Sequence, residues 1–283
     1  MMNDWSNAMN QQNFRARGVG VAVLSLVLIA CAPGDASLDG RMAAAEGETL
    51  TWDLLDCEAI ILLLPATAEA LAPHLPEGFS PLPLADAVAE MDVPVDPVDG
   101  NIGVETFECA SGAGLHGPVE PMTYGSYYVM VEPPEEFRRE VDFHFIKWDV
   151  LVPDAERRAL LQAHGVPALD GGVTTTVFQQ VDAIKFGDQS LSIGGSSHRL
   201  VANGAVPYSK SQGRIAEFTV TEHGLVEWQT DFEFHSVSNG PAVVEVGPDN
   251  LLAEVVGAGP QVGAAFIGSM SFVQGQIRLP IGQ

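Results

Sequence analysis

The chain has 283 residues, of which 37 are acidic and 13 are basic, and its formal net charge at pH 7 is −24. Phosphate binding needs clustered Lys and Arg, so this excess of carboxylates argues against a nucleic-acid partner. Anionic lipid headgroups would be repelled for the same reason, so contact with a membrane would need an anchor.

The N-terminus has the pattern of a processing signal. Arg15 and Arg17 precede an apolar run over residues 18–30. About 13 residues are too short to span a bilayer but are typical of a signal-peptide core. The run closes with "LIAC", which resembles the lipobox of bacterial lipoproteins. The resemblance implies cleavage before Cys31 and acylation of its thiol, with an ordinary secretory signal as the alternative. Enterobacterial lipoproteins that stay in the inner membrane have Asp after the cysteine, so by the same resemblance Ala32 favours the outer membrane or cell surface.

Composition then divides the chain. Residues 31–48 are rich in Ala, Gly and Asp and have no apolar period, which predicts a flexible tether. From residue 49 to 283 we find no repeat and no second linker in the sequence. We therefore expect a signal peptide over 1–30, a tether over 31–48 and one β-rich domain over 49–283, two small domains being the alternative.

The three cysteines suggest one disulfide. If Cys31 carries lipid, then Cys57 and Cys109 are left to pair in an oxidising compartment. Two buried free thiols are the alternative. Neither cysteine lies in a Cys-x-x-Cys motif, so the sequence gives no support for redox or zinc chemistry.

An acidic segment, "EMDVPVDPVDG", carries Glu90, Asp92, Asp96 and Asp99. Its spacing does not match the EF-hand loop, and its prolines favour a stiff acidic loop. Calcium binding by this segment stays open, and we predict no metal site and no cofactor.

Three short helices are predicted. The first lies in "ATAEALAPHL". The second follows Asp154 as N-cap, spans Ala155 to His164 and stops at Gly165. The third lies in "PDNLLAEVVGAG", with Asp249 as N-cap and Gly257 at its end.

Strands dominate the remainder. In "LVEWQTDFEFHS" apolar and polar residues alternate, which predicts one buried and one solvated face. This strand pairs with "RIAEFTVTE" through a turn at His223 and Gly224. Further strands are predicted in NIGVETFEC, GSYYVMVE, DFHFIKWDVLV, GVTTTVFQQV, HRLVAN and AAFIGSMSFVQGQIRL. Many strands with few short helices predict a mainly β protein with a closed or partly closed, barrel-like antiparallel sheet.

Two segments between residues 55 and 180 carry a family resemblance. "LLLPATAEALAPHLPEGFSPLPL" combines an Ala-rich helix with a Leu-Pro-x-Gly-Phe turn, and "YGSYYVMVEPP" is followed by "HFIKWDVLVPDAERRALLQAHGVPALDGG". Both resemble secreted, uncharacterised proteins of the acetoacetate decarboxylase-like superfamily. The resemblance implies a cone of β-strands around an apolar cavity.

The same resemblance does not carry over the chemistry. Decarboxylases of this type form a Schiff base on a lysine that has a second lysine beside it. The family's pair follows a Gly-x-Pro turn, where this chain has Ala168 and Leu169. The carboxylate that the family places near the start of a barrel strand is replaced by Gly125 and Ser126. Decarboxylation through a lysine imine is therefore disfavoured.

Other candidate residues come from the predicted strands. His144, Lys147 and Glu105 are candidates for reassigned acid or base roles. Because Ile146 and Trp148 share the parity of His144, we expect those three to line a cavity and Lys147 to point outward. "GGSSHRL" adds His198 and Arg199 as ligand-binding candidates at a barrel mouth.

These observations favour binding over catalysis. We expect an exported, lipid-anchored protein whose apolar cavity binds or carries a small hydrophobic or carboxylated molecule. The alternatives are an acetoacetate decarboxylase-like enzyme with reassigned residues, a lyase or hydrolase, and an acidic surface protein. The ligand and the oligomeric state are not specified by the sequence.

The anchor gives a first prediction. Cys31→Ala should move the protein from the membrane to the soluble fraction, because one thiol would carry all of the lipid. Labelling of cells with radioactive palmitate, followed by fractionation, measures both effects. Equal incorporation of label into the variant and the natural protein would contradict the prediction.

Overall fold

The computed structural model describes residues 49–283 except 90, 92, 115–117, 120, 164, 182–183, 205, 208–211, 222–223 and 279–283. The predicted signal peptide, tether and Cys31 lie outside the described residues, as do Glu90, Asp92 and His223. Among the residues that the structure describes, we find no helix long and apolar enough to cross a membrane.

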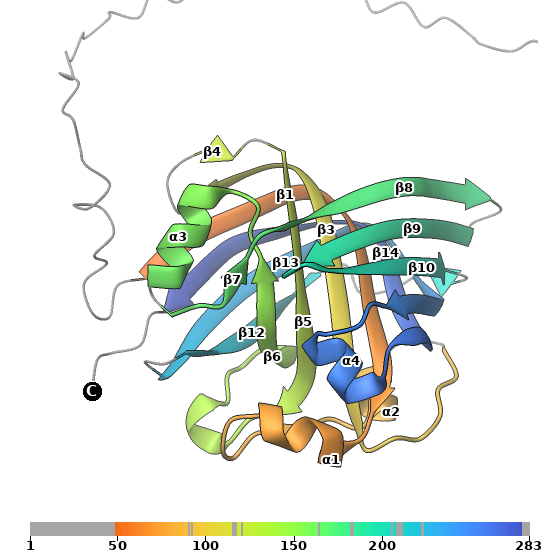
Figure 1. Ribbon diagram of the computed structural model, residues 1–283. Coiled ribbons are helices and arrows are strands. Elements are labelled where there is room, and N and C mark those ends of the chain that lie inside the picture. Colours follow the sequence, from red (N-terminus) through yellow and green to blue (C-terminus); the bar gives the residue numbers. More distant parts are fainter. Residues whose placement is uncertain are drawn as a thin grey trace, which may run out of the picture.

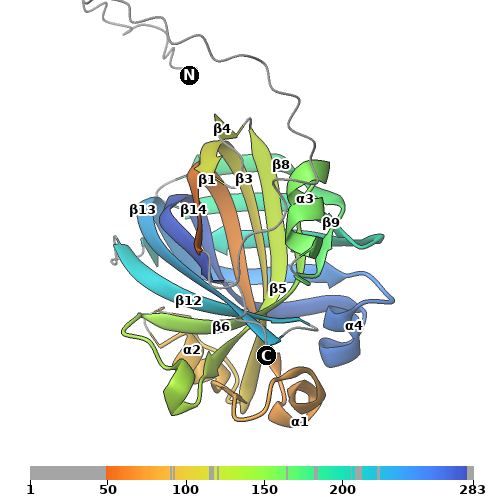
Figure 2. The same ribbon diagram turned by 90° about the vertical axis from the view of Figure 1, so that its left-hand side faces the viewer.

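Long strands form a ring of hydrogen-bonded neighbours. β12 pairs with β6 on one side and with β13 on the other, so the order β12-β6-β5-β3-β1-β14-β13 returns to its start. The β6–β12 pair is parallel. This confirms the expected mainly β, partly closed sheet, visible in Figure 2. The ring strands are β1 (Thr49–Ala66), β3 (Gly100–Gly114), β5 (Met122–Glu132), β6 (Phe143–Leu151), β12 (Gln212–Thr221), β13 (Gly224–Val246) and β14 (Gly259–Arg278).

A second layer continues from the far half of β13. Its strands are β10 (Ser196–Gly204), β9 (Ile184–Ile193) and β8 (Gly171–Val181), which curl over the outside of the ring in Figure 1. Short strands complete the sheet at β2 (Ser80–Pro81), β4 (Pro118–Val119), β7 (Ala168–Leu169) and β11 (Val206–Pro207).

Helices lie at the two ends of the ring. Figures 1 and 2 place α1 (Ala68–Leu71) and α2 (Leu84–Ala87) at one end and α3 (Ala155–Ala163) at the other. Short 3-10 turns occur at Ala72–His74 and Glu135–Phe137. The predicted N-cap Asp154 is confirmed, since its Oδ1 accepts the Arg157 N–H at 2.8 Å.

α4 (Leu251–Val256) begins one residue later than the sequence suggested. Its N-cap is Asn250 and not Asp249, because the Asn250 side chain accepts the Ala253 N–H. Asp249 instead has a positive φ of 60°, so its backbone turns the chain into the helix.

Two apolar layers lie on the two faces of β1. Ile60, Leu62 and Leu64 point toward the second layer of strands, where they join a core with Leu191 and Leu200. Ile61 and Leu63 point into the ring. Both faces of β1 are therefore covered here, and its sequence over residues 59–66 is continuously apolar instead of alternating.

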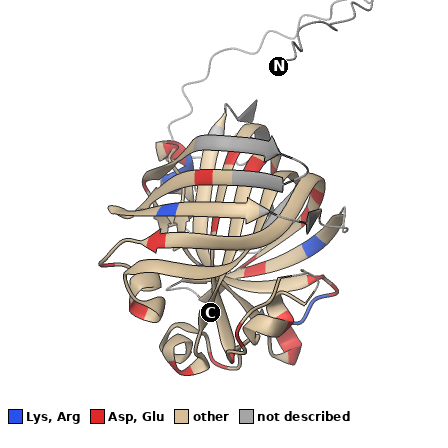
Figure 3. Ribbon diagram, turned by 90° about the vertical axis from the view of Figure 1, so that its right-hand side faces the viewer, with Lys and Arg blue, Asp and Glu red and all other residues tan. Residues whose placement is uncertain are grey.

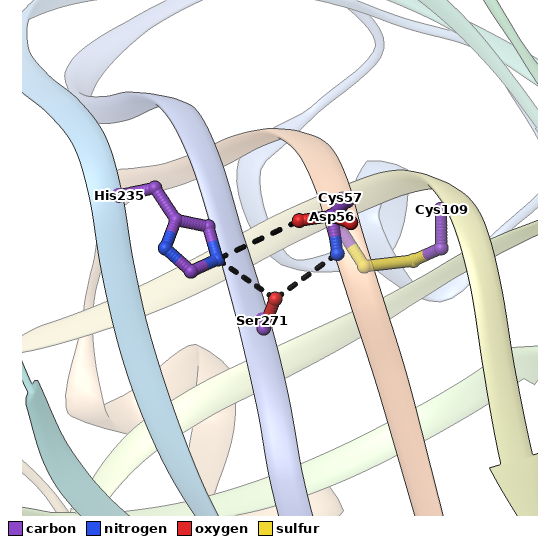
Figure 4. Close-up of a disulfide and its surroundings, with 5 residues drawn as sticks. All are labelled: Asp56, Cys57, Cys109, His235 and Ser271. Atoms are coloured by element: carbon purple, nitrogen blue, oxygen red, sulfur yellow. Dashed lines mark hydrogen bonds and ion pairs between the residues drawn. A yellow bond between two sulfur atoms is a disulfide. The ribbon is translucent and has the colours of Figure 1, made fainter. Parts of the chain in front are cut away.

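A disulfide joins two neighbouring ring strands. Cys57 on β1 and Cys109 on β3 are register partners and both are buried, which confirms the predicted bond (Figure 4). Beside it, Asp56 adopts a positive φ of 50° at an irregularity in the β1–β14 pairing. The Asp56 N–H donates to Ser271 Oγ at 3.0 Å, which holds this irregular turn of β1 against β14.

Acidic residues far outnumber basic residues in the chain. Figure 3 shows red segments on many strands and loops and few blue ones, with no basic stripe on the face in view.

The disulfide provides a stability prediction. Reduction should lower the thermal midpoint, because the bond closes a loop with a sequence separation of 52, for which chain entropy gives on the order of 4 kcal/mol. The measurement is thermal unfolding with and without reductant, beside mass spectrometry of the unreduced protein.

The Cys57→Ser, Cys109→Ser double variant is the matched control and should unfold near the temperature of the reduced protein. Free thiols at both positions in the native protein would refute the bond.

Candidate functional site

The inner faces of β3, β6 and β12 bring three charged side chains together. Lys147 Nζ lies 2.7 Å from Glu105 Oε1 and 2.6 Å from Glu217 Oε1. All three residues are buried, with exposed fractions of 7% or less. Because burying an unpaired charge costs several kcal/mol, the three charges are only tolerable as a cluster.

The pairing of the strands creates this cluster. On β12, Ile215, Glu217 and Thr219 are alternate residues, and Thr219 is the register partner of Lys147 on the parallel strand β6. Side chains at alternate positions of a strand share one face. Glu217 therefore points to the same side of the sheet as Thr219, two residues before it on β12, and so lies next to Lys147.

Two side chains of β5 complete the polar layer. Lys147 Nζ donates to Tyr124 Oη at 2.9 Å, and Ser126 Oγ donates to Glu105 Oε1 at 2.6 Å. The ammonium also lies 5.0 Å from the centre of the Tyr124 ring. Lys147 is thus held by three strands at once.

The lysine is held in its charged form. Burial lowers the pKa of Lys147, but the carboxylates of Glu105 and Glu217 outweigh burial and raise it well above its ordinary value. A nucleophilic amine must be neutral. At neutral pH Lys147 is therefore an ammonium and a poor nucleophile.

The same surroundings shift the pKa of Glu217 toward neutral pH. Burial raises its pKa to about 7; the Lys147 ammonium opposes that shift, and the Glu105 carboxylate adds to it. Both protonation states of Glu217 are populated near pH 7, as acid–base catalysis requires. Burial also raises the pKa of Tyr124 and of Tyr128, so both phenols stay protonated.

An apolar cavity of about 80 Å³ opens beside the charged cluster. Glu105 and Glu217 are in its wall, with Tyr128, and half of the remaining lining residues are phenylalanine. The phenylalanines in the wall are Phe143, Phe145, Phe232, Phe234, Phe266 and Phe272. A cavity with an apolar wall and a few polar groups on one side is the usual form of a small-molecule site.

Hydroxyl groups face the same interior. Thr219 and Thr230 are buried, and each has a hydroxyl oxygen without a hydrogen-bond partner among the described residues. Thr230 is the register partner of Ile215, which lines the cavity. Buried hydroxyls are normally bonded, so these two are exceptions within the described part of the ring.

A larger hollow lies outside the ring. It measures about 380 Å³ and is bounded by β1, the segment 93–96, β13 and β14. Its described wall contains Asp96 as a charged residue and is otherwise mostly apolar. Without converging titratable groups it is a weaker candidate for chemistry than the smaller cavity.

Among the sequence-predicted residues, Glu105 and Lys147 belong to the interior cluster. The expectation that Lys147 points outward is wrong, because Phe143, Phe145 and Lys147 share the inner face of β6. Ile146 and Trp148, predicted to line a cavity, pack instead in the core between the ring and the second layer.

The predicted histidines lie apart from the cluster. The ring of His144 is half-buried, and its Nε2 accepts the Arg139 N–H at 3.0 Å. His198 lies in the other core, where Nε2 contacts Tyr127 Oη at 2.5 Å and Nδ1 accepts the Gly247 N–H. Burial lowers the pKa of His198 to about 4. Arg199 is exposed and pairs with Asp188. None of the three lines the cavity.

A Ser–His–Asp grouping beside the disulfide is not a catalytic triad. In Figure 4 the Nε2 atom of His235 faces both Ser271 Oγ, at 2.8 Å, and Asp56 Oδ1, at 3.9 Å. A triad needs the carboxylate at the other ring nitrogen, where it sets the tautomer that accepts the serine proton.

The sequence did not indicate Glu217, Tyr124 or Tyr128. The segment "RIAEFTVTE" carries no local signal for Glu217, which shares its parity with Thr219 and Thr221, whereas Ala216, Phe218 and Val220 lie on the other parity. The pairing of β12 with β6 could not be inferred, since the two strands are far apart in the chain.

The positions that the family resemblance marked for chemistry are structural here. Ala168 is fully buried beside Val166 and Leu161. A side chain at Gly125 would meet Leu191 at 2.8 Å, so this position faces the other core. The candidate site therefore uses other positions of the fold.

Comparisons with known proteins identify the fold. No family model and no curated protein match the chain. Among solved structures, the enduracididine biosynthesis enzyme MppR with bound HEPES has a TM-score of 0.56 at 13% identity, covering 87% of this chain and 89% of its own. At such identities the likeness concerns the fold alone.

Two further structures agree. Acetoacetate decarboxylase from Legionella pneumophila has a TM-score of 0.51 at 13% identity, covering 90% of this chain and 97% of its own. An acetoacetate decarboxylase-like enzyme from Sphingomonas wittichii RW1 has a TM-score of 0.53 at 15% identity, covering 90% and 98%. The chain thus has the acetoacetate decarboxylase-like fold that its sequence suggested.

The raised pKa of Glu217 predicts how stability depends on pH. The folded protein holds a proton that the unfolded chain releases near pH 4.5, so the stability from Glu217 is lost as pH rises toward 7. Glu217→Gln should remove this loss. Relative to the natural protein, the variant should gain on the order of 3 kcal/mol between pH 4.5 and pH 8.

Urea unfolding of both proteins across this pH range measures the difference. Titrating groups away from the cluster contribute equally in both proteins and cancel. A difference in unfolding free energy that stays constant with pH would contradict the assignment.

Proposed function

We propose that the protein is an enzyme of the acid–base type that acts on a compact, largely apolar carbonyl compound inside the ring. One observation carries the proposal: Glu105 and Glu217, joined by the Lys147 ammonium, open together onto a cavity walled by phenylalanine. Convergence of titratable groups inside an apolar cavity is the arrangement that separates catalysis from simple binding.

Proton transfer suits the cluster better than imine formation. The Lys147 amine would have to lose a proton to attack a carbonyl carbon, and two carboxylates within 2.7 Å oppose that loss. The carboxylate of Glu217 can remove a proton from the carbon beside a carbonyl group, which leaves an enolate and a neutral carboxyl group. Return of the proton restores both partners.

The charge developing on the substrate oxygen needs a stabilising donor. Tyr128 lines the cavity, and its hydroxyl is 3.5 Å from the Leu62 carbonyl oxygen, a long contact that a substrate oxygen can replace. A neutral phenol donates such a hydrogen bond without adding charge. Tyr128 is the residue that we assign to this role.

The fold gives independent but weaker support. The structures that share it are those of enzymes, and one MppR structure is a complex with pyruvate. A shared fold does not establish a shared reaction. It does agree with a carbonyl compound as the substrate.

A carrier is the second candidate. The aromatic wall favours it, because phenylalanine contributes to binding a hydrophobic molecule without taking part in proton transfer. Binding without any exchange of substrate protons would identify a carrier.

The place of action is proposed from the sequence. We propose export and anchoring of the domain to a bacterial membrane through a lipid on Cys31, with the outer membrane or cell surface as the location. The acidic domain would then work in an oxidising compartment, in which Cys57 and Cys109 pair.

Exchange of hydrogen for deuterium on butanone tests the reaction. In deuterated buffer, the protein should speed loss of the signals of the protons beside the carbonyl in the proton NMR spectrum. The rate should rise as pH passes about 7, because the carboxylate form of Glu217 is the base. Glu217→Gln should lower the rate about 100-fold or more.

Glu132→Gln, at an exposed glutamate, is the control and should leave the rate unchanged. Acetoacetate with borohydride should leave Lys147 unmodified in a peptide map. Absence of exchange at saturating butanone would refute the acid–base enzyme, and a reduced adduct on Lys147 would replace it with an imine mechanism.

A further inference from the structure

We infer that the cavity selects a compact amine in its cationic form: the ligand's ammonium contacts Glu105 and Glu217 while its apolar part packs among the phenylalanines. This inference adds an ammonium group to the carbonyl substrate of the proposed enzyme and in that respect rests on the proposed function. It concerns binding and is tested without a catalytic readout.

The two glutamates have atoms available for a ligand. Both ion pairs with Lys147 use Oε1 of the glutamates, and so does the Ser126 hydrogen bond. Within the described part of the chain, we find no hydrogen bond to Oε2 of either residue. Because both residues line the cavity, these second oxygens can accept N–H donors from a molecule inside it.

Charge balance favours a cation. When both glutamates are ionised, the two carboxylates and the one ammonium of the buried cluster leave one negative charge uncompensated. A cationic ligand neutralises the cluster. An anionic ligand would add a second uncompensated charge in a buried site, which is strongly unfavourable.

The aromatic wall suits the same ligand. Phe143, Phe145, Phe234 and Phe266 are half-buried and line the cavity, so their rings remain accessible from it. Phe234 and Phe266 are stacked, with centroids 6.3 Å apart. The faces of aromatic rings attract cations, and cages of such rings beside carboxylates recognise ammonium groups in other proteins.

Binding should be linked to proton release. The charged and titratable groups that face Glu217 are Lys147, Glu105, Tyr124 and Tyr128, and its pKa is about 7 because of burial, against the effect of Lys147. A cation beside Glu217 stabilises its carboxylate, so the proton that Glu217 holds near neutral pH should leave when the ligand binds.

Three probes of the same shape test the inference on the folded protein: isobutylamine, isobutanol and isobutyrate. At pH 8, calorimetric titration should give the amine an affinity at least about 10-fold higher than that of the alcohol, and isobutyrate no binding. At pH 6.5, titrations in two buffers with different ionisation enthalpies should show release of protons on binding of the amine.

Glu105→Gln should reduce the affinity for isobutylamine about 10-fold and leave that for isobutanol unchanged, and Glu132→Gln should alter neither. Should Glu105→Gln not fold, proton release by the natural protein still decides. Equal affinities for amine and alcohol, or no proton release, would overturn the cation inference and leave the exchange test of the enzyme untouched. Preference for isobutyrate would overturn it by showing an anion site.

Discussion

The interior of this protein depends on the ion pairs of Lys147 with Glu105 and Glu217. Three buried charges are unfavourable unless they form ion pairs and hydrogen bonds with one another. Here β3, β12 and β5 supply the partners of the Lys147 ammonium at 2.6 to 2.9 Å. Loss of either glutamate would remove one partner of the buried ammonium. Breaking a buried ion pair in this way typically lowers the free energy of unfolding by about 3–5 kcal/mol. The sheet therefore has to close with β12 against β6 for the charges to be tolerated.

The same closure sets the protonation states on which the proposed chemistry depends. β12 brings Glu217 to the cluster through a parallel pairing with β6, the only parallel contact between long strands in the described sheet. Burial raises the pKa of Glu217 to about 7, while the carboxylates keep Lys147 charged. One environment thus moves a carboxyl group toward neutrality and keeps an amine ionised, which separates an acid–base role from a nucleophilic one.

Much of the fold follows from sequence patterns, and the exceptions have physical causes. The alternation in β13 and the cap at Asp154 were sufficient to place a strand and a helix correctly. β1 was not predicted, because a run that is apolar on both parities has no period of two. The same ambiguity on β6 misplaced Lys147, since Ile146 and Phe145 are both apolar and only the surrounding layers decide which faces inward. The site needed long-range pairing between β3, β6 and β12, which no local pattern encodes.

The positions of the lysines separate the fold from its chemistry. The resemblance implies a reactive lysine directly after the Gly-x-Pro turn, where Ala168 is packed against α3 and β6. Lys147 lies instead in the middle of β6, on its inner face, with two carboxylates in place of a second lysine. A neighbouring ammonium lowers a lysine pKa and carboxylates raise it, so the two arrangements favour opposite protonation states. Structures at 13–15% identity share the fold of this ring. The charged residues inside the ring can differ between sequences that share this fold. In this chain they support the proposed proton transfer over imine formation.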